Sequence, residues 1–344
     1  MVATPRSAPA SAWPATSSGT GLIAADVGGT HVRIASVHAH GAAMELAHYR
    51  TYRCAEHASL EAIVGDFLAA TAVPRQSLVI AAPGVALDDG NVVSNNLPWP
   101  LSRHRLRATL ELRSVQLVND FEAVAYAAPQ MALSAVAQLS GPTPRHARAT
   151  GPILVVGPGT GLGAAVWIDA TPHPVVLATE AGQMALASDQ PQEQLLLQRM
   201  RRGQSYLPLE HVLSGPGLQR LYLALCDRQG EQPRHAQPDA ITHAALHTDD
   251  ALARTCLQLF CGWLGSAVGD MALAYAATGG IYLAGGILPS LAPFLASSEF
   301  RVRFLDKGRM RAVLEGIPVH VVEHGQLGVR GAASWYLQQR HDQS

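Results

Sequence analysis

Charged residues, cysteines and long apolar segments are all scarce in this sequence. Asp, Glu, Lys and Arg make up 15% of the 344 residues and the formal net charge is −1, so the chain has no general field for nucleic acid or an anionic membrane. No run reaches the roughly 18 apolar residues of a membrane span. Four cysteines without a C-x-x-C pair are too few to crosslink a chain of this length. These deficits predict a cytoplasmic protein with reduced thiols and small-molecule partners.

Two common nucleotide-binding motifs are also missing. No placement of G-x-G-x-x-G fits the glycine-rich run from Gly157 to Gly163, and no G-x-x-x-x-G-K-[ST] loop occurs in the chain. Rossmann dehydrogenases and Walker-type NTPases are therefore disfavoured. The fifteen histidines, His38 and His40 among them, lack partners at zinc spacing, so no structural metal is expected.

The segment from Leu22 to Val37 predicts two strands joined by a tight glycine turn. Gly28 and Gly29 permit positive φ angles that would turn backbone N–H groups into an anion-binding nest, and Thr30 adds a hydroxyl. Asp26 suits a site where Mg²⁺ and its waters lie between a carboxylate and a nucleotide. We expect a metal nucleotide here, and the alternative is a hairpin with no ligand.

The same plan recurs after the polar, Pro- and Gly-rich segment 140–152, which predicts a linker. A strand at 153–156, a glycine turn and a strand at 164–168 repeat the opening of the chain. Two α/β domains of one plan are therefore predicted, after a disordered tail at residues 1–20. Other predicted strands are 46–52, 77–82, 92–93, 115–118, 175–178, 281–284 and 319–322. Predicted helices are 60–70, 103–112 capped by Ser102, 121–128, one with Leu195, Leu196 and Met200 on its apolar side, one capped by Ser214 and running to Cys226, 249–277 and 328–339.

Asn119 and Asp120 follow the predicted strand 115–118. At the carboxyl end of a parallel strand, side chains project to where open α/β sheets bind ligands. Asp120 is able to orient an attacking hydroxyl and accept its proton, and Asn119 offers a donor and an acceptor. The alternative is a helix cap or Asx turn without catalytic function.

Five motifs, in order, resemble those of the bacterial glucokinases, members of the sugar kinase, Hsp70 and actin superfamily. They are Asp26-Val27-Gly28-Gly29-Thr30, Val118-Asn119-Asp120-Phe121, Gly157 to Gly163, Leu213-Ser214-Gly215-Pro216-Gly217-Leu218 and Ala284-Gly285-Gly286-Ile287. The resemblance runs from about residue 22 to 337. It implies two ribonuclease H-like (actin-like ATPase) α/β domains flanking a nucleotide and sugar cleft. The small domain would comprise residues 21–130 plus 324–344, and the large domain 131–323.

The resemblance also implies ATP-dependent phosphorylation of glucose at its 6-hydroxyl, the first step of glycolysis, with Mg²⁺ and ATP, and it suggests a homodimer. Asp120 would be the catalytic base. Nucleotide-binding residues would be Asp26, Gly28, Gly29, Thr30, Gly159, Thr160, Gly161, Ser214, Gly215, Gly285 and Gly286. Carboxylates and amides suit pyranose hydroxyls, so the substrate-binding candidates are Asn96, Asn119, Asp120, Glu180, Gln183 and Glu210.

One motif departs from the family pattern. Where the family has Glu-Gly-Gly-His, this chain has Glu180-Ala181-Gly182-Gln183. Gln183 lacks the ring and the charge of histidine, and Ala181 adds a methyl group where the backbone is expected to pass a ligand. Two alternatives follow: a kinase for another hexose such as mannose or an amino sugar, and a sugar-binding regulator without turnover.

Overall fold

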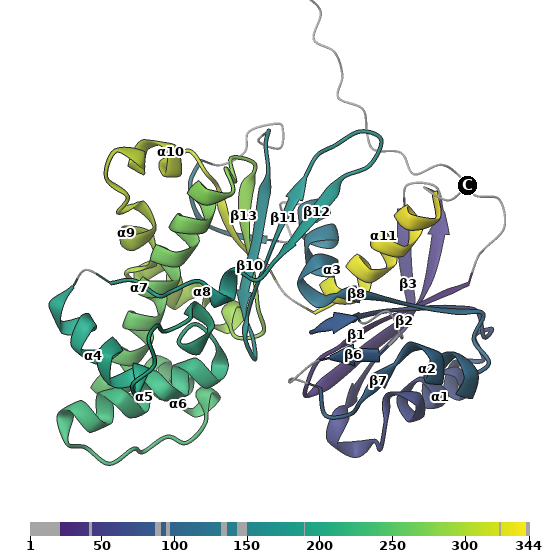
Figure 1. Ribbon diagram of the computed structural model, residues 1–344, viewed down its shortest axis with the longest axis horizontal. Helices are drawn as coiled ribbons and strands as arrows, with labels where there is room; N and C mark the ends of the chain where they lie inside the picture. Colours follow the sequence, from purple (N-terminus) through teal and green to yellow (C-terminus); the bar gives the residue numbers. More distant parts are fainter. Residues whose placement is uncertain are drawn as a thin grey trace, which may run out of the picture. The chain divides into compact units, whose positions relative to one another are not determined.

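The chain forms two compact units (Figure 1), and the computed structural model describes residues 21–40, 43–86, 91–93, 97–131, 136–142, 150–188, 190–322 and 325–341. The small unit comprises residues 1–123 and 328–344, and the large unit comprises residues 124–327. The tail expected at residues 1–20 lies outside the described residues. The domain limits expected from the sequence, at residues 130 and 324, stay a prediction.

The small unit contains a five-stranded sheet with the order β3-β2-β1-β4-β8. Its strands are β1 (Leu22–Val27), β2 (His31–His40), β3 (Ala43–Arg53), β4 (Ser77–Ala82) and β8 (Ser114–Asn119). β1 is parallel to β4, and β4 is parallel to β8. The carboxyl ends of β1 and β8 therefore lie at the same edge of the sheet, where the first glycine turn and the Asn-Asp pair follow.

Helices cover both faces of this sheet. Alternate residues of β1 join two hydrophobic clusters, one with α1 (Leu60–Thr71) and α2 (Arg103–Thr109) and the other with α11 (Leu327–His341), as the two-residue period of a strand requires. An added Cβ on Gly331 of α11 would lie 1.7 Å from the carbonyl oxygen of Ala123. Glycine thus allows α11 to pack directly against α3. Further elements are α3 (Asp120–Ala127), β5 (Val85–Ala86), β6 (Asn91–Val93), β7 (Leu101–Ser102), η1 (Cys54–Glu56) and η2 (Ala128–Gln130).

The large unit contains a six-stranded sheet with the order β12-β11-β10-β13-β14-β9. Its strands are β9 (Val136–Ser140), β10 (Ile153–Pro158), β11 (Leu162–Ile168), β12 (Val175–Thr179), β13 (Gly280–Ala284) and β14 (Val319–Val322). β10, β13 and β14 are parallel, and the other pairings are antiparallel. The glycine turn after β10 and the glycine pair after β13 consequently share one edge.

Helix α7 (Ala251–Ala274) is the central helix of the large unit and contacts α5, α6 and α9. It is apolar and long enough to cross a membrane, with a mean hydropathy of 1.3 over 18 residues, but 72% of that window is buried inside the protein. This degree of burial is typical of a helix in the core of a folded domain. The remaining helices are α4 (Pro191–Arg201), α5 (Gly215–Gln229), α6 (Pro238–His247), α8 (Leu288–Ser297), α9 (Phe300–Leu305), α10 (Arg311–Glu315) and η6 (Gly308–Met310).

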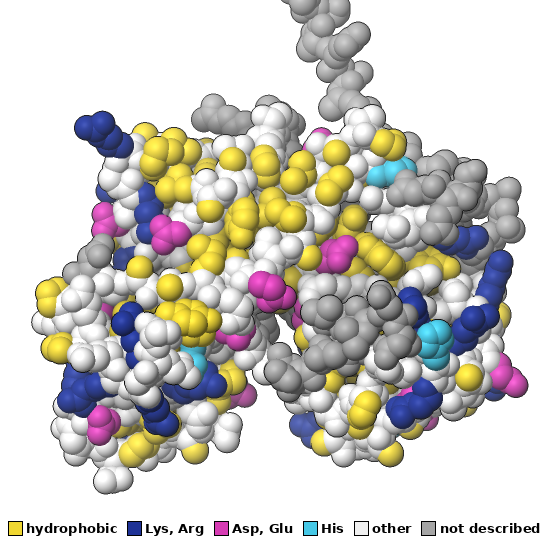
Figure 2. All heavy atoms as spheres, viewed as in Figure 1, with side chains coloured by type: hydrophobic (Ala, Val, Ile, Leu, Met, Phe, Trp, Pro, Cys, Tyr) yellow, Lys and Arg dark blue, Asp and Glu magenta, His cyan; other side chains and the backbone are white. Residues whose placement is uncertain are grey.

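Strand β12 forms one edge of the large sheet and carries apolar residues outward. Val175 and Leu177 are 54% and 49% exposed. On the face drawn in Figure 2, hydrophobic side chains gather over β10 to β12. The strand predicted at 175–178 is thus present, and its apolar residues are exposed because it lies at the edge of the sheet.

Most predicted strands and helices are present within a few residues of their expected limits, but several details differ. Ser102 precedes α2 without accepting a side-chain capping bond from the described helix. Leu195, expected on the apolar side of α4, is 62% exposed, whereas Leu196 and Met200 are buried. Ser140, expected in the linker, ends strand β9. The four cysteines, all described, are free and buried.

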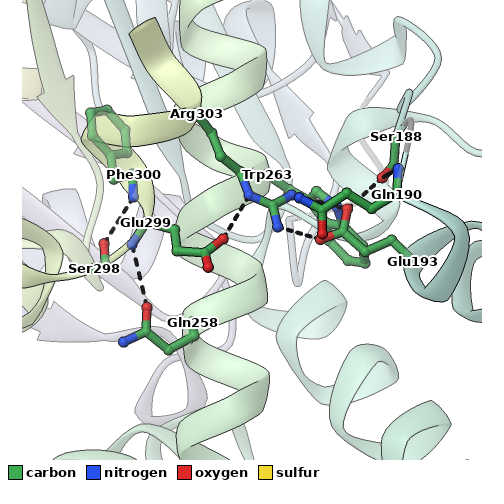
Figure 3. Close-up of polar contacts among 9 residues, drawn as sticks. All are labelled: Ser188, Gln190, Glu193, Gln258, Trp263, Ser298, Glu299, Phe300 and Arg303. Atoms are coloured by element: carbon green, nitrogen blue, oxygen red, sulfur yellow. Dashed lines mark hydrogen bonds and ion pairs between the residues drawn. The ribbon is translucent and has the colours of Figure 1, made fainter. Parts of the chain in front are cut away.

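A buried ion pair joins α4, α7 and α9 (Figure 3). Arg303 of α9 donates through both terminal nitrogens to Glu193 of α4, with Nη1 at 2.9 Å from Oε2, and Trp263 Nε1 of α7 lies 2.6 Å from the same oxygen. Ser188 also donates to this carboxylate. Burial raises the pKa of Glu193, but the Arg303 guanidinium and the Ser188 and Trp263 donors outweigh it and hold that pKa below its usual value. Glu193 is thus a buried, charged carboxylate that accepts hydrogen bonds from Arg303, Trp263 and Ser188.

We expect Arg303→Leu to lower the free energy of unfolding by about 3–5 kcal/mol, because Glu193 would keep a buried charge without its partner. Arg199→Leu is the matched control: Arg199 and Asp227 form an ion pair of 2.7 Å between half-exposed and exposed side chains, where the loss should stay below about 1 kcal/mol. Urea unfolding of both variants checks this. Similar losses in the two variants would contradict it.

Candidate active site

The second glycine turn joins β10 to β11 as predicted. The N–H of Gly159 donates to the carbonyl of Gly161 at 2.8 Å. Neither glycine has a φ in the left-handed region, and the same is true of Gly28. The positive φ expected at Gly28 and Gly29 of the first turn is therefore not observed. Gly161 lies beside Glu210, since a Cβ there would lie 2.7 Å from Oε2 at the end of that side chain.

Two predicted sugar-binding residues meet beside this turn. Gln183 Nε2 donates to Glu210 Oε1 at 2.8 Å, from η4 (Ala181–Gln183) to η5 (Leu209–His211). The structure therefore brings Gly161, Gln183 and Glu210 together within the large unit. Glu180 lies exposed at the start of η4.

The methyl group of Ala181 does not face a ligand. Ala181 is 3% exposed and belongs to the hydrophobic core of the large unit. Its neighbour Gly182 makes the close approach, because a Cβ there would lie 2.3 Å from the carbonyl oxygen of Leu162. The expected conflict at Ala181 is thus corrected, and Gln183 remains as the departure at the polar surface.

The Ser214-Gly215 loop is tied to the same turn. The N–H of Gly215 donates to the carbonyl of Gly159 at 2.8 Å. Ser214 caps α5 as predicted: its hydroxyl accepts from Gly217 N at 3.0 Å and donates to the carbonyl of Glu210 at 2.7 Å. Ser214 is 1% exposed, so its two hydrogen bonds are buried and hold the loop in place. Gly215, the next residue, is half-buried.

Gly285 and Gly286 have different surroundings. A Cβ on Gly285 would lie 2.4 Å from the carbonyl oxygen of Pro158, whereas no described atom lies within 4 Å of a Cβ on Gly286. Gly286 lines a cavity of about 480 Å³ together with residues of α6 and α8. The first glycine therefore permits backbone packing, and the second borders open space large enough for a small ligand.

In the small unit, the first turn is a hairpin with Gly29 and Thr30 at its tip. Gly28 N donates to the carbonyl of His31 at 3.0 Å, and the N–H of Cys54 donates to the carbonyl of Thr30 at 2.9 Å. The Cys54 thiol also donates to the carbonyl of Gly28 at 3.4 Å. Thr30 is exposed, so its hydroxyl is accessible to a ligand.

Asp26 is the carboxylate nearest the first glycine turn that could hold a metal ion. It is 5% exposed and accepts from Arg33 Nη1 at 3.3 Å, and no cluster of three metal-ligating side chains occurs among the described residues. Mg²⁺ in nucleotide enzymes takes one or two carboxylates and draws its other ligands from phosphates and water. A single carboxylate fits that donor set through water, with Arg33 fixing its orientation.

Asn119 and Asp120 lie at the carboxyl end of β8, where α3 begins. The Oδ1 atom of Asn119 accepts from Phe121 N at 3.0 Å and from Glu122 N at 3.1 Å, which is the capping contact considered as the alternative. The Asn119 amide nitrogen has no partner among the described residues. Capping and ligand binding are thus compatible: the oxygen serves the helix, and the NH₂ group is available as a donor only.

Asp120 is half-buried at the same position, and its Oδ1 atom accepts from Phe121 N at 2.9 Å. Nearby Glu122 is half-buried and shares a hydrogen bond with Trp335 of α11, while burial raises its pKa. Asn96, the remaining sugar-binding candidate, lies outside the described residues.

Comparison with known proteins agrees with these motifs. The glucokinase family model matches residues 23–339. The chain belongs to the glucokinase family. A glucokinase-like protein of Xylella fastidiosa strain 9a5c is 50% identical over 322 residues, covering 93% of this chain and 95% of that protein. A glucokinase of Tolumonas auensis is 34% identical over 319 residues, covering 93% and 97%. The crystal structure of a glucokinase from an Antarctic psychrotroph has 31% identity, a TM-score of 0.77 and coverage of 93% and 99%.

Membership of the glucokinase family confirms the fold expected from the resemblance, an α/β architecture with two sheets of the actin-like ATPase type. Sequence reasoning missed the residues of α6 that line the cavity beside Gly286, among them Asp239, Thr242 and His243. Asp239 and His243 are four residues apart, a spacing that places both on one face of a helix. This four-residue spacing of Asp239 and His243 is the sequence feature that could have predicted a polar helix face here.

Gly285 and Gly286 differ in their surroundings: Gly285 packs against the backbone of β10, and Gly286 borders a cavity. We expect Gly285→Ala to lower the free energy of unfolding by about 1–3 kcal/mol, because the new Cβ meets backbone of β10. Gly286→Ala should change it by less than about 0.5 kcal/mol, because no described atom meets its Cβ. Urea unfolding distinguishes the two variants, and an equal loss in both would contradict this reading.

Proposed function

We propose that this chain transfers the γ-phosphoryl group of ATP to the 6-hydroxyl of glucose. The observation that carries the proposal is the placement of Asp120, a half-buried carboxylate at the carboxyl end of the parallel strand β8. Family membership supports a sugar kinase of this type. Phosphoryl transfer needs little covalent help from a protein, so positioning and charge neutralisation are the functions to assign.

In this proposal Asp120 orients the 6-hydroxyl and accepts its proton as the bond to phosphorus forms. The contact with Phe121 N fixes one oxygen of this carboxylate. Asn119 donates its amide N–H₂ to a neighbouring sugar hydroxyl. It serves as a donor alone, because its oxygen caps α3.

The large unit would supply phosphate and sugar contacts. The turn from Gly159 to Gly161 offers small, accessible backbone to the phosphates, and Gly215 is held against it. Glu210 would accept from sugar hydroxyls, and Gln183, already bound to Glu210, would extend the polar surface toward the same sugar. Glu180 is a further acceptor at the start of η4.

When bound, Mg²⁺ neutralises phosphate charge. Asp26 would hold it through water, supported by Arg33. Cytoplasmic location and a homodimer are parts of the same proposal, inferred from the free cysteines and the family respectively.

A kinase for another hexose is the second candidate, and Gln183 is the observation that favours it. A neutral amide that donates to Glu210 reduces the number of acceptors open to the sugar, whereas histidine at this position is expected from the family. A non-catalytic regulator is less well supported, because Asp120 and the phosphate turn are both retained in exposed or half-buried positions.

The first test is ADP release with Mg²⁺, ATP and glucose for the protein and for Asp120→Asn. We expect kcat to fall roughly 100- to 10,000-fold, because the amide keeps the contact with Phe121 but cannot accept the proton. Asp227→Asn, an exposed aspartate of the large unit, is the control and should retain full activity. Sugar-independent ADP release, or unchanged kcat in Asp120→Asn, would contradict the proposal.

The second test concerns the sugar. Gln183→His and Gln183→Leu are compared with the native protein on glucose, mannose, fructose, glucosamine and N-acetylglucosamine. Because Gln183 touches Glu210, we expect Gln183→Leu to raise KM for the preferred sugar roughly tenfold with a smaller change in kcat. Gln183→His should shift the ratio of kcat/KM between sugars. Identical sugar profiles in all three proteins would remove Gln183 from the sugar site.

A further inference from the structure

The first glycine turn of the small unit is held on its inner side by the segment that follows β3. Cys54, the first residue of η1, makes two hydrogen bonds to this turn. Its backbone N–H donates to the carbonyl of Thr30 at 2.9 Å, and its thiol donates to the carbonyl of Gly28 at 3.4 Å. One residue therefore binds the carbonyl groups on both sides of Gly29, at the tip of the turn.

The Cys54 thiol belongs to the hydrophobic core beneath the turn. Cys54 is 2% exposed and lies in the same cluster as Val27 and Val32, which pair across the two strands that the turn joins. Burial raises the pKa of the thiol, so the thiol keeps its proton at neutral pH and remains a donor. A thiol is a weak donor, but a hydrogen bond that is shielded from water is stronger than the same bond in water.

The contact at Gly28 fixes the direction of the next backbone N–H group. The peptide bond between Gly28 and Gly29 is trans, and the C=O and N–H groups of a planar trans peptide point in opposite directions. Because the Gly28 carbonyl is turned to Cys54, the Gly29 N–H points away from Cys54 and the core. Neither this N–H nor that of Thr30 makes a hydrogen bond within the part of the chain that the structure describes. Two adjacent free N–H donors beside the exposed Thr30 hydroxyl suit an anion such as phosphate.

We propose that Cys54 is a positioning residue for the phosphate donor: it holds the turn so that the N–H groups of Gly29 and Thr30 meet the phosphates of the nucleotide. The proposal rests on the proposed function for the identity of that donor. Positive φ angles, which orient N–H groups in an anion-binding nest, are absent at Gly28 and Gly29. The contacts from Cys54 supply the orientation instead. Cys54 does not touch the nucleotide itself and acts through the carbonyl of Gly28.

The test compares Cys54→Ala, which removes the thiol donor, with Cys54→Ser, which supplies a hydroxyl donor in its place. Cys261→Ala is the matched control, because Cys261 is a 0% exposed cysteine of α7 in the large unit. The β,γ-imido analogue of ATP is titrated calorimetrically into the full chain with Mg²⁺ and without sugar, at a temperature where circular dichroism shows every variant folded. We expect Cys54→Ala to bind the analogue roughly fivefold more weakly than the native protein. Cys54→Ser and Cys261→Ala should bind it within about twofold of the native affinity.

Steady-state kinetics separate positioning from a general structural effect. In turnover with glucose, Cys54→Ala should raise KM for ATP roughly fivefold and leave KM for glucose within about twofold, because the turn contacts the phosphate donor alone. Cys54→Ser should restore KM for ATP to within about twofold of the native value. A rise of both KM values by the same factor in Cys54→Ala would contradict the proposal.

Unchanged affinity for the analogue in Cys54→Ala would overturn the proposal. An equal loss in Cys54→Ser would show that the packing of sulfur, rather than a donor, holds the turn, and an equal loss in Cys261→Ala would assign the effect to the loss of a buried thiol in general; either result would overturn the proposal as well. The sugar-kinase proposal is tested separately. If the affinities change as expected and no sugar is phosphorylated, the kinase proposal fails and the positioning function of Cys54 stands; if sugar is phosphorylated and the affinities are unchanged, the reverse holds.

Discussion

Close approach of backbone at the carboxyl ends of β10 and β13 is the constraint on which the large unit depends. A Cβ on Gly157 would lie 1.6 Å from the carbonyl oxygen of Ala284, and one on Gly285 would lie 2.4 Å from that of Pro158. Only glycine permits two strands to end this close together. The turn after β10 and the cavity beside Gly286 are positioned by that contact, and Gly215 joins α5 to the same turn.

Polar side chains at the strand ends of each unit combine a structural contact with a proposed binding role. Asn119 caps α3 with its oxygen, and in the proposed function its amide group donates to the sugar; Ser214 caps α5 and donates to the carbonyl of Glu210. A helix cap and a binding residue are therefore not exclusive interpretations of the same motif.

Local signals predicted much of the fold. The strands 77–82 and 319–322 have the expected limits, because each is a continuous apolar run with clear boundaries. Helices α6 and α8 were missed, since α6 is short and α8 contains Pro293, which is a helix breaker by local rules. Burial against the rest of the large unit outweighs those local preferences.

The site was predicted in its residue types more reliably than in its geometry. Gly161, Gln183 and Glu210 were all named, but their mutual contact depends on tertiary packing of η4 and η5. The conformational argument for Gly28 and Gly29 was wrong, because neither glycine has a φ in the left-handed region.

The most direct test of the central claim is to identify the product. The protein is incubated with glucose, Mg²⁺ and ATP, and the phosphorylated sugar is analysed by phosphorus and carbon NMR. Phosphoryl transfer through Asp120 predicts glucose 6-phosphate and ADP in equal amounts. A phosphate on another carbon, or ADP formed with inorganic phosphate and no phosphosugar, would contradict it.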